Sequence, residues 1–209
     1  MEQETCIASV RINELQHRRK RKRILPARIK EPLETPEQLN HTWSMDFMHN
    51  VLENGRKVRI LNIIDDYNRE AIAQEVAYSQ NSESVIRTLE NLIIERDEPL
   101  RIRTDNGPKF ISKVFQEWCS ENDIINSYTQ PGKPTQNAYI EPFNRTYRED
   151  ILDAYLFENI EQLRFLTQQF RLDYNENHPH KSLGGLSPIK YAMNSGKLSK
   201  FTTIHSLTG

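Results

Sequence analysis

Three acidic residues stand apart from the ordinary surface charge of this 209-residue chain, which contains 29 Asp and Glu in all. Asp46 lies in a run of aromatic and apolar residues, where an ionised side chain is costly unless it has a partner. Asp105 opens the tight-turn sequence Asp-Asn-Gly-Pro, and Glu141 follows a sequence typical of a helix start. Three carboxylates that converge repel one another, and a divalent cation is the usual way to neutralise them.

Carboxylate oxygens favour Mg²⁺ or Mn²⁺, and Mg²⁺ is commonly held by one or two carboxylates together with phosphate oxygens of a substrate. Two such ions about 3.5–4 Å apart can activate a water or a sugar hydroxyl and stabilise the leaving oxygen of an in-line phosphoryl displacement. This chemistry is that of a nuclease or a strand-transfer enzyme. Three acids are weak evidence by themselves, so the inference depends on elements that would bring them together.

Hydrophobic periodicity predicts those elements. Residues 42–52 and 57–64 are expected to be strands joined by a turn at Glu53–Arg56, and residues 70–77 alternate as a third strand. The later predictions are a helix at about 82–96 with Ser82 as N-cap, a strand at 100–104, a helix with Val114, Phe115 and Trp118 on one face, a strand at 124–128, and helices at about 137–153 and 159–176.

This order predicts an α/β domain with a mixed five-stranded sheet, made of a three-strand antiparallel meander and two parallel strands, with helices on both faces. Asp46 would lie inside the first strand, Asp105 at the exit of the fourth, and Glu141 in the first or second turn of its helix. Strand ends and a packed helix start can meet at one edge of a sheet, where α/β folds place their sites. The three acids are therefore site candidates.

The formal net charge of -1 conceals a cationic N-terminal segment. Residues 1–30 carry nine Lys or Arg and three Glu, a net charge of +6. Residues 31–209 therefore carry a net charge of -7. Six consecutive basic residues followed by prolines predict an arm at 1–39, before a core at 40–192 and a tail at 193–209. The basic run comprises Arg18, Arg19, Lys20, Arg21, Lys22 and Arg23. If the rest of the chain is an enzyme that acts on nucleic acid, we expect this run to contact DNA.

Composition excludes several other classes of protein. Cys6 and Cys119 cannot make a disulfide framework or a cysteine zinc site. No stretch approaches the roughly 18 apolar residues of a membrane span, and the N-terminus lacks the apolar run of a signal peptide. We therefore expect a cytoplasmic protein with no membrane partner.

The sequence blocks around the three acids resemble the integrase catalytic core, which retroviral integrases share with many bacterial insertion-sequence transposases. Thirty-five residues separate Asp105 from Glu141, the spacing that names this Asp-Asp-Glu (DDE) family, and a basic residue, Arg148, follows the Glu by seven positions. The blocks that carry the resemblance are 43–47, 103–110 and 136–148.

Further blocks are similar to the second-frame (OrfB-type) subunit of two-frame insertion-sequence transposases. The resemblance runs from about residue 18 to residue 192. These blocks are 62–70, 130–137, 152–157 and 173–183.

The resemblance implies a ribonuclease-H-like fold and a Mg²⁺-dependent polynucleotidyl transferase that acts in DNA transposition and integration. It would nick element ends and then use the freed 3′-hydroxyl to attack target DNA, on two Mg²⁺ (or Mn²⁺) ions. Asp46, Asp105 and Glu141 would be the catalytic metal ligands. The candidates for phosphate contacts are Lys133, Arg145 and Arg148.

The resemblance also implies partners. These are DNA, as transposon ends and as target, further copies of the same chain in a homo-oligomer, and an upstream-frame helix-turn-helix subunit. The protein would then be associated with the bacterial nucleoid.

Two departures from the family pattern leave an alternative function open. Family members usually carry a basic residue directly after the Glu and an acid at position 109, where this chain has Pro142 and Lys109. Proline is tolerated in the first turn of a helix but costs about 3 kcal/mol deeper, where it would mis-aim Glu141. We also expect that the helical DNA-binding region that precedes the core in such subunits is missing. The alternative is a truncated or decayed core that binds DNA or transposase subunits without catalysis.

Other residues that could do chemistry receive structural interpretations. Asp65 and Asp66 are explained by a turn between strands. Trp43 and Trp118 are interpreted as core residues. Asn106 and Gly107 either shape the loop of a metal site or only make the turn, and the sequence leaves both interpretations open.

Overall fold

The structure is a computed structural model that describes residues 36–128 and 138–196. The predicted arm before residue 36, with its basic run at 18–23, lies outside the described residues. So do Lys133 and most of the predicted tail. Within the described ranges, none of the helices has the length and apolar character needed to cross a membrane.

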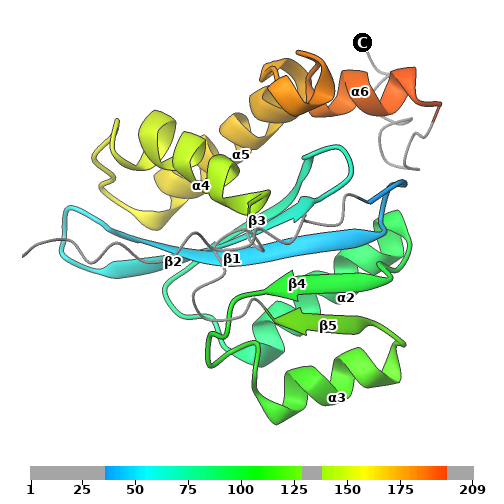
Figure 1. The fold of residues 1–209 in the computed structure, drawn as a ribbon. Coiled ribbons are helices and arrows are strands. Elements are labelled where there is room, and N and C mark those ends of the chain that lie inside the picture. Colours follow the sequence, from blue (N-terminus) through cyan, green and yellow to red (C-terminus); the bar gives the residue numbers. More distant parts are fainter. Residues whose placement is uncertain (1–35, 129–137, 197–209) are drawn as a thin grey trace, which may run out of the picture. The chain divides into compact units, whose positions relative to one another are not determined.

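A five-stranded mixed sheet forms the centre of the domain, with the strand order β3-β2-β1-β4-β5 (Figure 1). β1, β2 and β3 pair as an antiparallel meander, while β4 pairs in parallel with both β1 and β5. The predicted fold class is therefore confirmed. The strands are β1 (Thr42–Val51), β2 (Lys57–Asp65), β3 (Ala71–Ala77), β4 (Arg101–Thr104) and β5 (Ile125–Tyr128).

Helices cover both faces of this sheet (Figure 1). α2 (Ser82–Arg96) and α3 (Lys113–Glu121) pack on one face. α4 (Ile140–Tyr147) and α5 (Ile160–Asn177) pack on the other. The shorter helical pieces are a π-helix at Arg148–Leu152, a 3₁₀ helix at Lys181–Leu183 and α6 (Pro188–Asn194).

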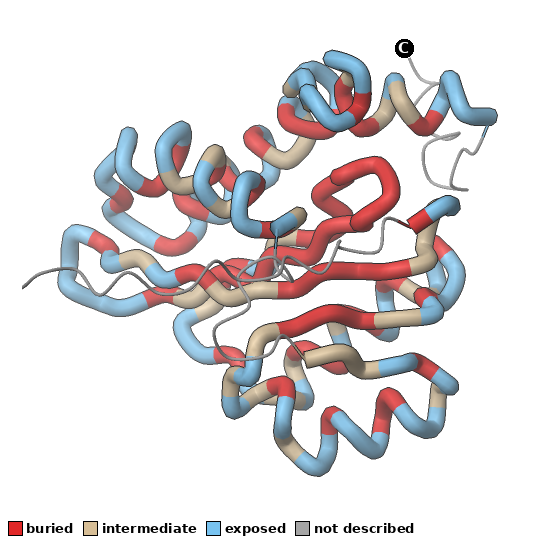
Figure 2. The backbone as a smooth tube through the Cα atoms, in the orientation of Figure 1, coloured by how far each residue is buried: buried red, intermediate tan, exposed pale blue. Residues whose placement is uncertain are grey.

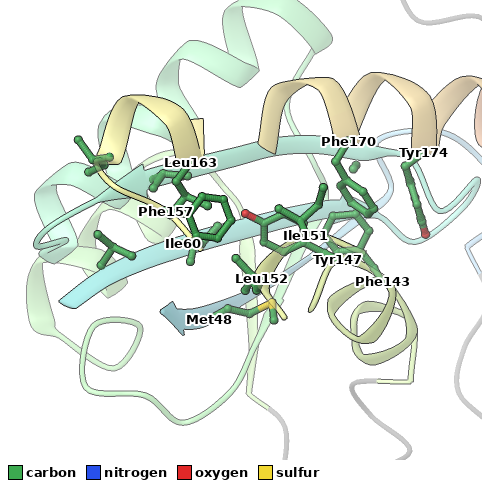
Figure 3. Packing of buried hydrophobic residues seen from close by; sticks show 14 of the residues in the cluster. Met48, Ile60, Phe143, Tyr147, Ile151, Leu152, Phe157, Leu163, Phe170 and Tyr174 are labelled. Carbon is green, nitrogen blue, oxygen red and sulfur yellow. The ribbon is translucent and has the colours of Figure 1, made fainter. Parts of the chain in front are cut away.

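Each face of the sheet has its own hydrophobic core, and the central strands between them are buried (Figure 2). Figure 3 shows the core under α4 and α5, where the ring of Tyr147 lies 6.5 Å from that of Phe143 and 5.1 Å from that of Phe170. The opposite core contains Trp43 and Trp118, which are 0% and 8% exposed. Both tryptophans are core residues, as predicted.

Side-chain alternation along β1 decides which face the first candidate acid lies on. Trp43 and Met45 pack in the core with α2 and α3, whereas Met48 packs in the core with α4 and α5. Successive strand residues point to opposite faces, so Asp46 shares the face of Met48 and lies on the α4 side of the sheet.

The structure corrects three details of the predicted elements. The N-cap of α2 is Asn81, not Ser82, because the Asn81 side chain accepts a hydrogen bond from the backbone of Ser84. Val114 is 50% exposed, since the buried stripe of α3 runs through Phe115 and the residues three and four positions later.

The helix predicted at about 137–153 is also not uniform. It is α-helical from Ile140 to Tyr147 and continues as a π-helix to Leu152. The short α6 was not predicted, because its seven residues are too few to show a clear hydrophobic period.

Candidate active site

The three candidate acids come from three different elements and meet on one part of the domain. Asp46 lies in β1, Asp105 directly follows β4, and Glu141 is the second residue of α4. Burial, the largest cause, and the negative charges of Asp105 and Glu141 together raise the pKa of Asp46 to about 6. The structure thus brings the three carboxylates within electrostatic range, and we call them the carboxylate site.

Two hydrogen bonds hold the carboxylate of Asp46. The backbone N–H of Phe47 donates to Oδ1 at 2.8 Å, and the side-chain amide of Asn144 donates to Oδ2 at 2.7 Å. Both bonds favour the ionised form and oppose the effect of burial on the pKa. Each carboxylate oxygen has a further lone pair with which to contact a cation.

Asp105 is held by the turn that follows β4. The backbone N–H of Gly107 donates to Oδ1 of Asp105 at 2.9 Å. A Cβ atom at position 107 would lie 2.8 Å from that oxygen, which is closer than real Cβ atoms come to other atoms. Gly107 therefore does more than make a turn, because its missing side chain leaves room for the Asp105 carboxylate.

Glu141 is exposed in the first turn of α4, and the helix is anchored around it. Ile140 and Phe143 are 0% and 1% exposed in the core. Pro142 is the third residue of the helix, where a backbone N–H would have no acceptor within the helix. The proline therefore removes no hydrogen bond, and the structural reason for expecting a mis-aimed Glu141 disappears.

The turn between β2 and β3 contacts two elements that position acids of the site: β4, which precedes Asp105, and the start of α4, which carries Glu141. Arg103 in β4 forms an ion pair with Asp66, with 2.6 Å between Nη1 and Oδ2. The guanidinium of Arg69 lies 3.6 Å from the centre of the Tyr139 ring, at the start of α4. The turn therefore fixes both the strand that precedes Asp105 and the helix that carries the glutamate.

A turn role accounts for only part of what Asp65 and Asp66 do. Oδ1 of Asp65 accepts a hydrogen bond from the backbone of Tyr67 at 2.8 Å, as expected of an aspartate in a turn. However, both acids are fully buried, and burial raises the pKa of Asp65 to about 7 and that of Asp66 to about 6. Neither belongs to the carboxylate site.

Two of the three predicted phosphate-binding cations lie in the described residues. Arg145 is exposed in the last turn of α4. Arg148 begins the π-helix, and its Nη1 lies 3.6 Å from Oδ1 of Asp153. Both belong to the helical segment that carries Glu141, and Lys133 lies outside the described residues.

The carboxylate site fits a hard divalent cation in the type and charge of its donors. As the side chains are placed, no group of three or more His, Cys, Asp or Glu among the described residues could hold a metal ion. Mg²⁺ usually takes only one or two carboxylates and completes its coordination with waters and substrate phosphates. The donors therefore fit a cation that is bound together with a phosphodiester.

Sequence reasoning missed Asn144, which touches Asp46 directly. Its signal in the sequence is its position three residues after Glu141, on the same side of α4. That spacing places it near the glutamate, but it does not say which strand residue the amide meets. The contact with Asp46 joins residues that are 98 positions apart.

The sheet order and the helices on both faces define a ribonuclease-H-like domain. Two family profiles, each described as an integrase core domain, match residues 36–134 and 122–188. The chain belongs to this family, as an integrase-like catalytic core of the kind found in insertion-sequence transposases.

Individual relatives agree with this assignment. An uncharacterized 39.2 kDa protein of insertion element IS476 from Xanthomonas euvesicatoria is 36% identical over 181 residues, which cover 87% of this chain and 52% of that protein. An uncharacterized 31.7 kDa protein of insertion element IS407 from Burkholderia multivorans is 37% identical over 178 residues, which cover 85% of this chain and 64% of that protein. The chain therefore spans about half to two thirds of the length of these relatives.

The fold is also that of a solved retroviral domain. The integrase catalytic core domain of HTLV-2, in a trimeric form in complex with magnesium, matches with a TM-score of 0.59 and 21% identity. The match covers 74% of this chain and 97% of that chain.

Proposed function

We propose that this chain is the catalytic core of an insertion-sequence transposase that nicks DNA at element ends and transfers the freed 3′-hydroxyl to target DNA. The family acts in DNA transposition and integration, and the proposal concerns the individual chemical steps. The observation that carries it is the convergence of Asp46, Asp105 and Glu141 within electrostatic range. Carboxylates gathered in this way, with no basic partner among the described residues, are suited to hold divalent cations.

Two Mg²⁺ or Mn²⁺ ions, when bound, would supply activation of the attacking oxygen and stabilisation of the leaving oxygen. Asp46, Asp105 and Glu141 would hold them. The hydrogen bonds from Phe47 and Asn144 fix the orientation of the Asp46 carboxylate before any ligand arrives. Such preorganisation matters because phosphoryl transfer depends on positioning and electrostatics.

DNA is the proposed partner, both as transposon ends and as target. Arg145 and Arg148 would contact backbone phosphates beside the carboxylate site, and the N-terminal basic run would add salt-dependent attraction. Homo-oligomers and an upstream-frame helix-turn-helix subunit remain part of the proposal. The trimeric form of the HTLV-2 catalytic core supports the first of these.

The decisive experiment measures Mg²⁺-dependent nicking of duplex DNA that carries the terminal repeats of the source element. We expect nicking by the wild type and a loss of about 10³-fold or more in Asp105→Asn. Asp150→Asn, which neutralises an exposed acid of the π-helix, is the matched control and should retain activity. A folded wild type that binds the DNA but never nicks it would instead support the non-catalytic alternative.

A further inference from the structure

A row of polar side chains crosses the face of the sheet that lies under α4. The strand register pairs Asp46 of β1 with Asn62 of β2, and Asn62 in turn with Gln74 of β3. Asn62 is fully buried, and its neighbours on the same face of β2 are Ile60 and Ile64, both in the α4–α5 core. The polar row therefore interrupts a face that is otherwise apolar.

Hydrogen bonds join this row into one relay that ends on the first site acid. Nε2 of Gln74 donates to Oδ1 of Asn62 at 3.1 Å, and Nδ2 of Asn62 donates to Oδ1 of Asn144 at 2.8 Å. Nδ2 of Asn144 then donates to Oδ2 of Asp46 at 2.7 Å. An ionised carboxylate only accepts hydrogen bonds, so every donor in the relay faces toward Asp46.

The relay determines which way each amide is turned. Because the carbonyl oxygen of Asn144 is occupied by Asn62, its NH₂ group is the side left for the carboxylate. Because the carbonyl oxygen of Asn62 is occupied by Gln74, its NH₂ group is in turn directed at Asn144. Without these bonds the Asn144 amide could rotate and present its oxygen to the carboxylate, which would repel it.

A buried amide at position 62 has no packing advantage over an apolar side chain. Burying an amide is unfavourable unless its polar atoms are hydrogen-bonded, and a leucine of similar volume would suit a position between Ile60 and Ile64. Both polar atoms of the Asn62 side chain are used within the relay. What the amide gains over an apolar residue is therefore its connection to Asn144 and Asp46.

We propose that Asn62, supported by Gln74, is a positioning residue for the carboxylate site and acts on Asp46 through Asn144. The inference rests on the proposed function, since it assumes that Asp46 holds a divalent cation. Asn144 belongs to the same helix as Glu141, so its hydrogen bond to Asp46 also connects α4 to β1. The relay thereby fixes the position of Glu141 relative to Asp46. Residues that orient metal ligands in this way typically change metal affinity about 10–100-fold when they are removed.

The test measures Mn²⁺ affinity of the full chain by electron paramagnetic resonance, together with the midpoint of thermal unfolding. We expect Asn62→Leu to bind Mn²⁺ at least about 10-fold more weakly than the wild type, with an unchanged or higher unfolding temperature. Gln74→Leu, one step further from Asp46, should weaken binding by less. Ile60→Val is the matched control on the same strand face, and it should lower the unfolding temperature without changing Mn²⁺ affinity.

A double-mutant cycle separates positioning from a general structural effect. If Asn62 acts through Asn144, then Asn62→Leu should weaken Mn²⁺ binding in the wild type but add nothing in an Asn144→Ala background. A purely structural role of Asn62 would give effects that add. Additive effects would therefore overturn the proposal.

The remaining outcomes distinguish this proposal from the proposed function. If the wild type nicks DNA and Asn62→Leu binds Mn²⁺ as tightly as the wild type, the relay is overturned and the transposase function stands. Absence of Mn²⁺ binding by the folded wild type would overturn both. If Asn62→Leu fails to fold, the half-buried Gln74 provides the same test through Gln74→Leu, and unchanged affinity there counts against the relay.

Discussion

The acidic turn, residues 65–70, and the carboxylate site lie in the same domain but accommodate negative charge differently. In the acidic turn, Arg96 donates to both carboxylate oxygens of Glu70, at 2.8 and 2.6 Å, and Arg103 pairs with Asp66. At the carboxylate site, no Lys or Arg of the described part of the chain lies within ion-pair distance of the three acids.

The difference lies in what compensates each charge. In the acidic turn, the buried carboxylates of Glu70 and Asp66 each pair with a guanidinium group of the same chain, that of Arg96 and that of Arg103. The carboxylate site leaves its charges facing one another, which raises the pKa of Asp46 after burial has already raised it. An acid that lacks an internal cation is therefore a better candidate for binding an external one than an acid that is merely buried.

The largest expected effect is a contrast between two Asp→Asn substitutions. Asp66→Asn leaves the guanidinium of Arg103 buried without its counter-charge, and we expect a loss of about 3–5 kcal/mol in the free energy of unfolding. Asp105→Asn relieves repulsion at the carboxylate site, so its free energy of unfolding should be unchanged or higher. Urea unfolding of both variants measures the contrast, and equal losses would show that the two regions do not differ in this way.

The second prediction concerns the pH dependence of stability. Burial raises the pKa of Asp65 to about 7, whereas the unfolded chain releases that proton near pH 3.8. The stabilisation from the protonated form is therefore fully present below pH 3.8 and is lost as the pH rises toward about 7. The loss should be at most about 1.4 kcal/mol per pH unit.

Comparison with Asp65→Asn isolates this contribution from those of other acids. Urea unfolding between pH 4 and pH 7 should show that the free energy of unfolding declines more steeply in the wild type than in the variant. Parallel curves would mean that Asp65 does not retain its proton in the folded chain.

The third prediction addresses the carboxylate site through Gly107→Ala. The added Cβ would collide with Oδ1 of Asp105, so the carboxylate must move or lose its bond to the backbone of residue 107. We expect Mn²⁺ affinity to fall about 10-fold, as for other groups that orient metal ligands. Asn106→Ala changes the exposed neighbouring residue and serves as the control. An unchanged affinity in Gly107→Ala would mean that the orientation of Asp105 is unimportant for the cation.

Most of the fold could be predicted because its signals are local. The strands at 42–52 and 57–64, rich in strand-forming residues, and the helix at 82–96 were predicted to within about a residue of their observed bounds. The prediction failed where local pattern does not decide the structure. A π-helix after Tyr147 leaves the hydrophobic pattern nearly unchanged, and the burial of Asp65 depends on segments that are distant in sequence.

The candidate site could be predicted in part for the same reason. Residue type and spacing singled out Asp46, Asp105 and Glu141, and the order of elements indicated that they could meet. The contacts that hold them in place were not predictable, because Asn62 and Asn144 are 82 residues apart and only the packed helix brings their amides together. The local signs of that network were the polar Asn62 in the middle of the apolar strand β2 and the position of Asn144 three residues after Glu141.

The smallest expected effect is that of Pro142→Arg, which introduces the basic residue usual at this position. Because Pro142 is exposed in the first turn of α4, where no backbone hydrogen bond is lost, the variant should nick DNA at the wild-type rate and change stability by less than about 0.5 kcal/mol. Pro142→Ala removes the proline without adding a positive charge, so it separates the effect of the backbone from the effect of the charge. If both variants nick faster, the proline mis-aims Glu141 and the carboxylate site is not preorganised as inferred; if only the arginine variant is faster, its new cation adds a DNA contact and the backbone argument stands.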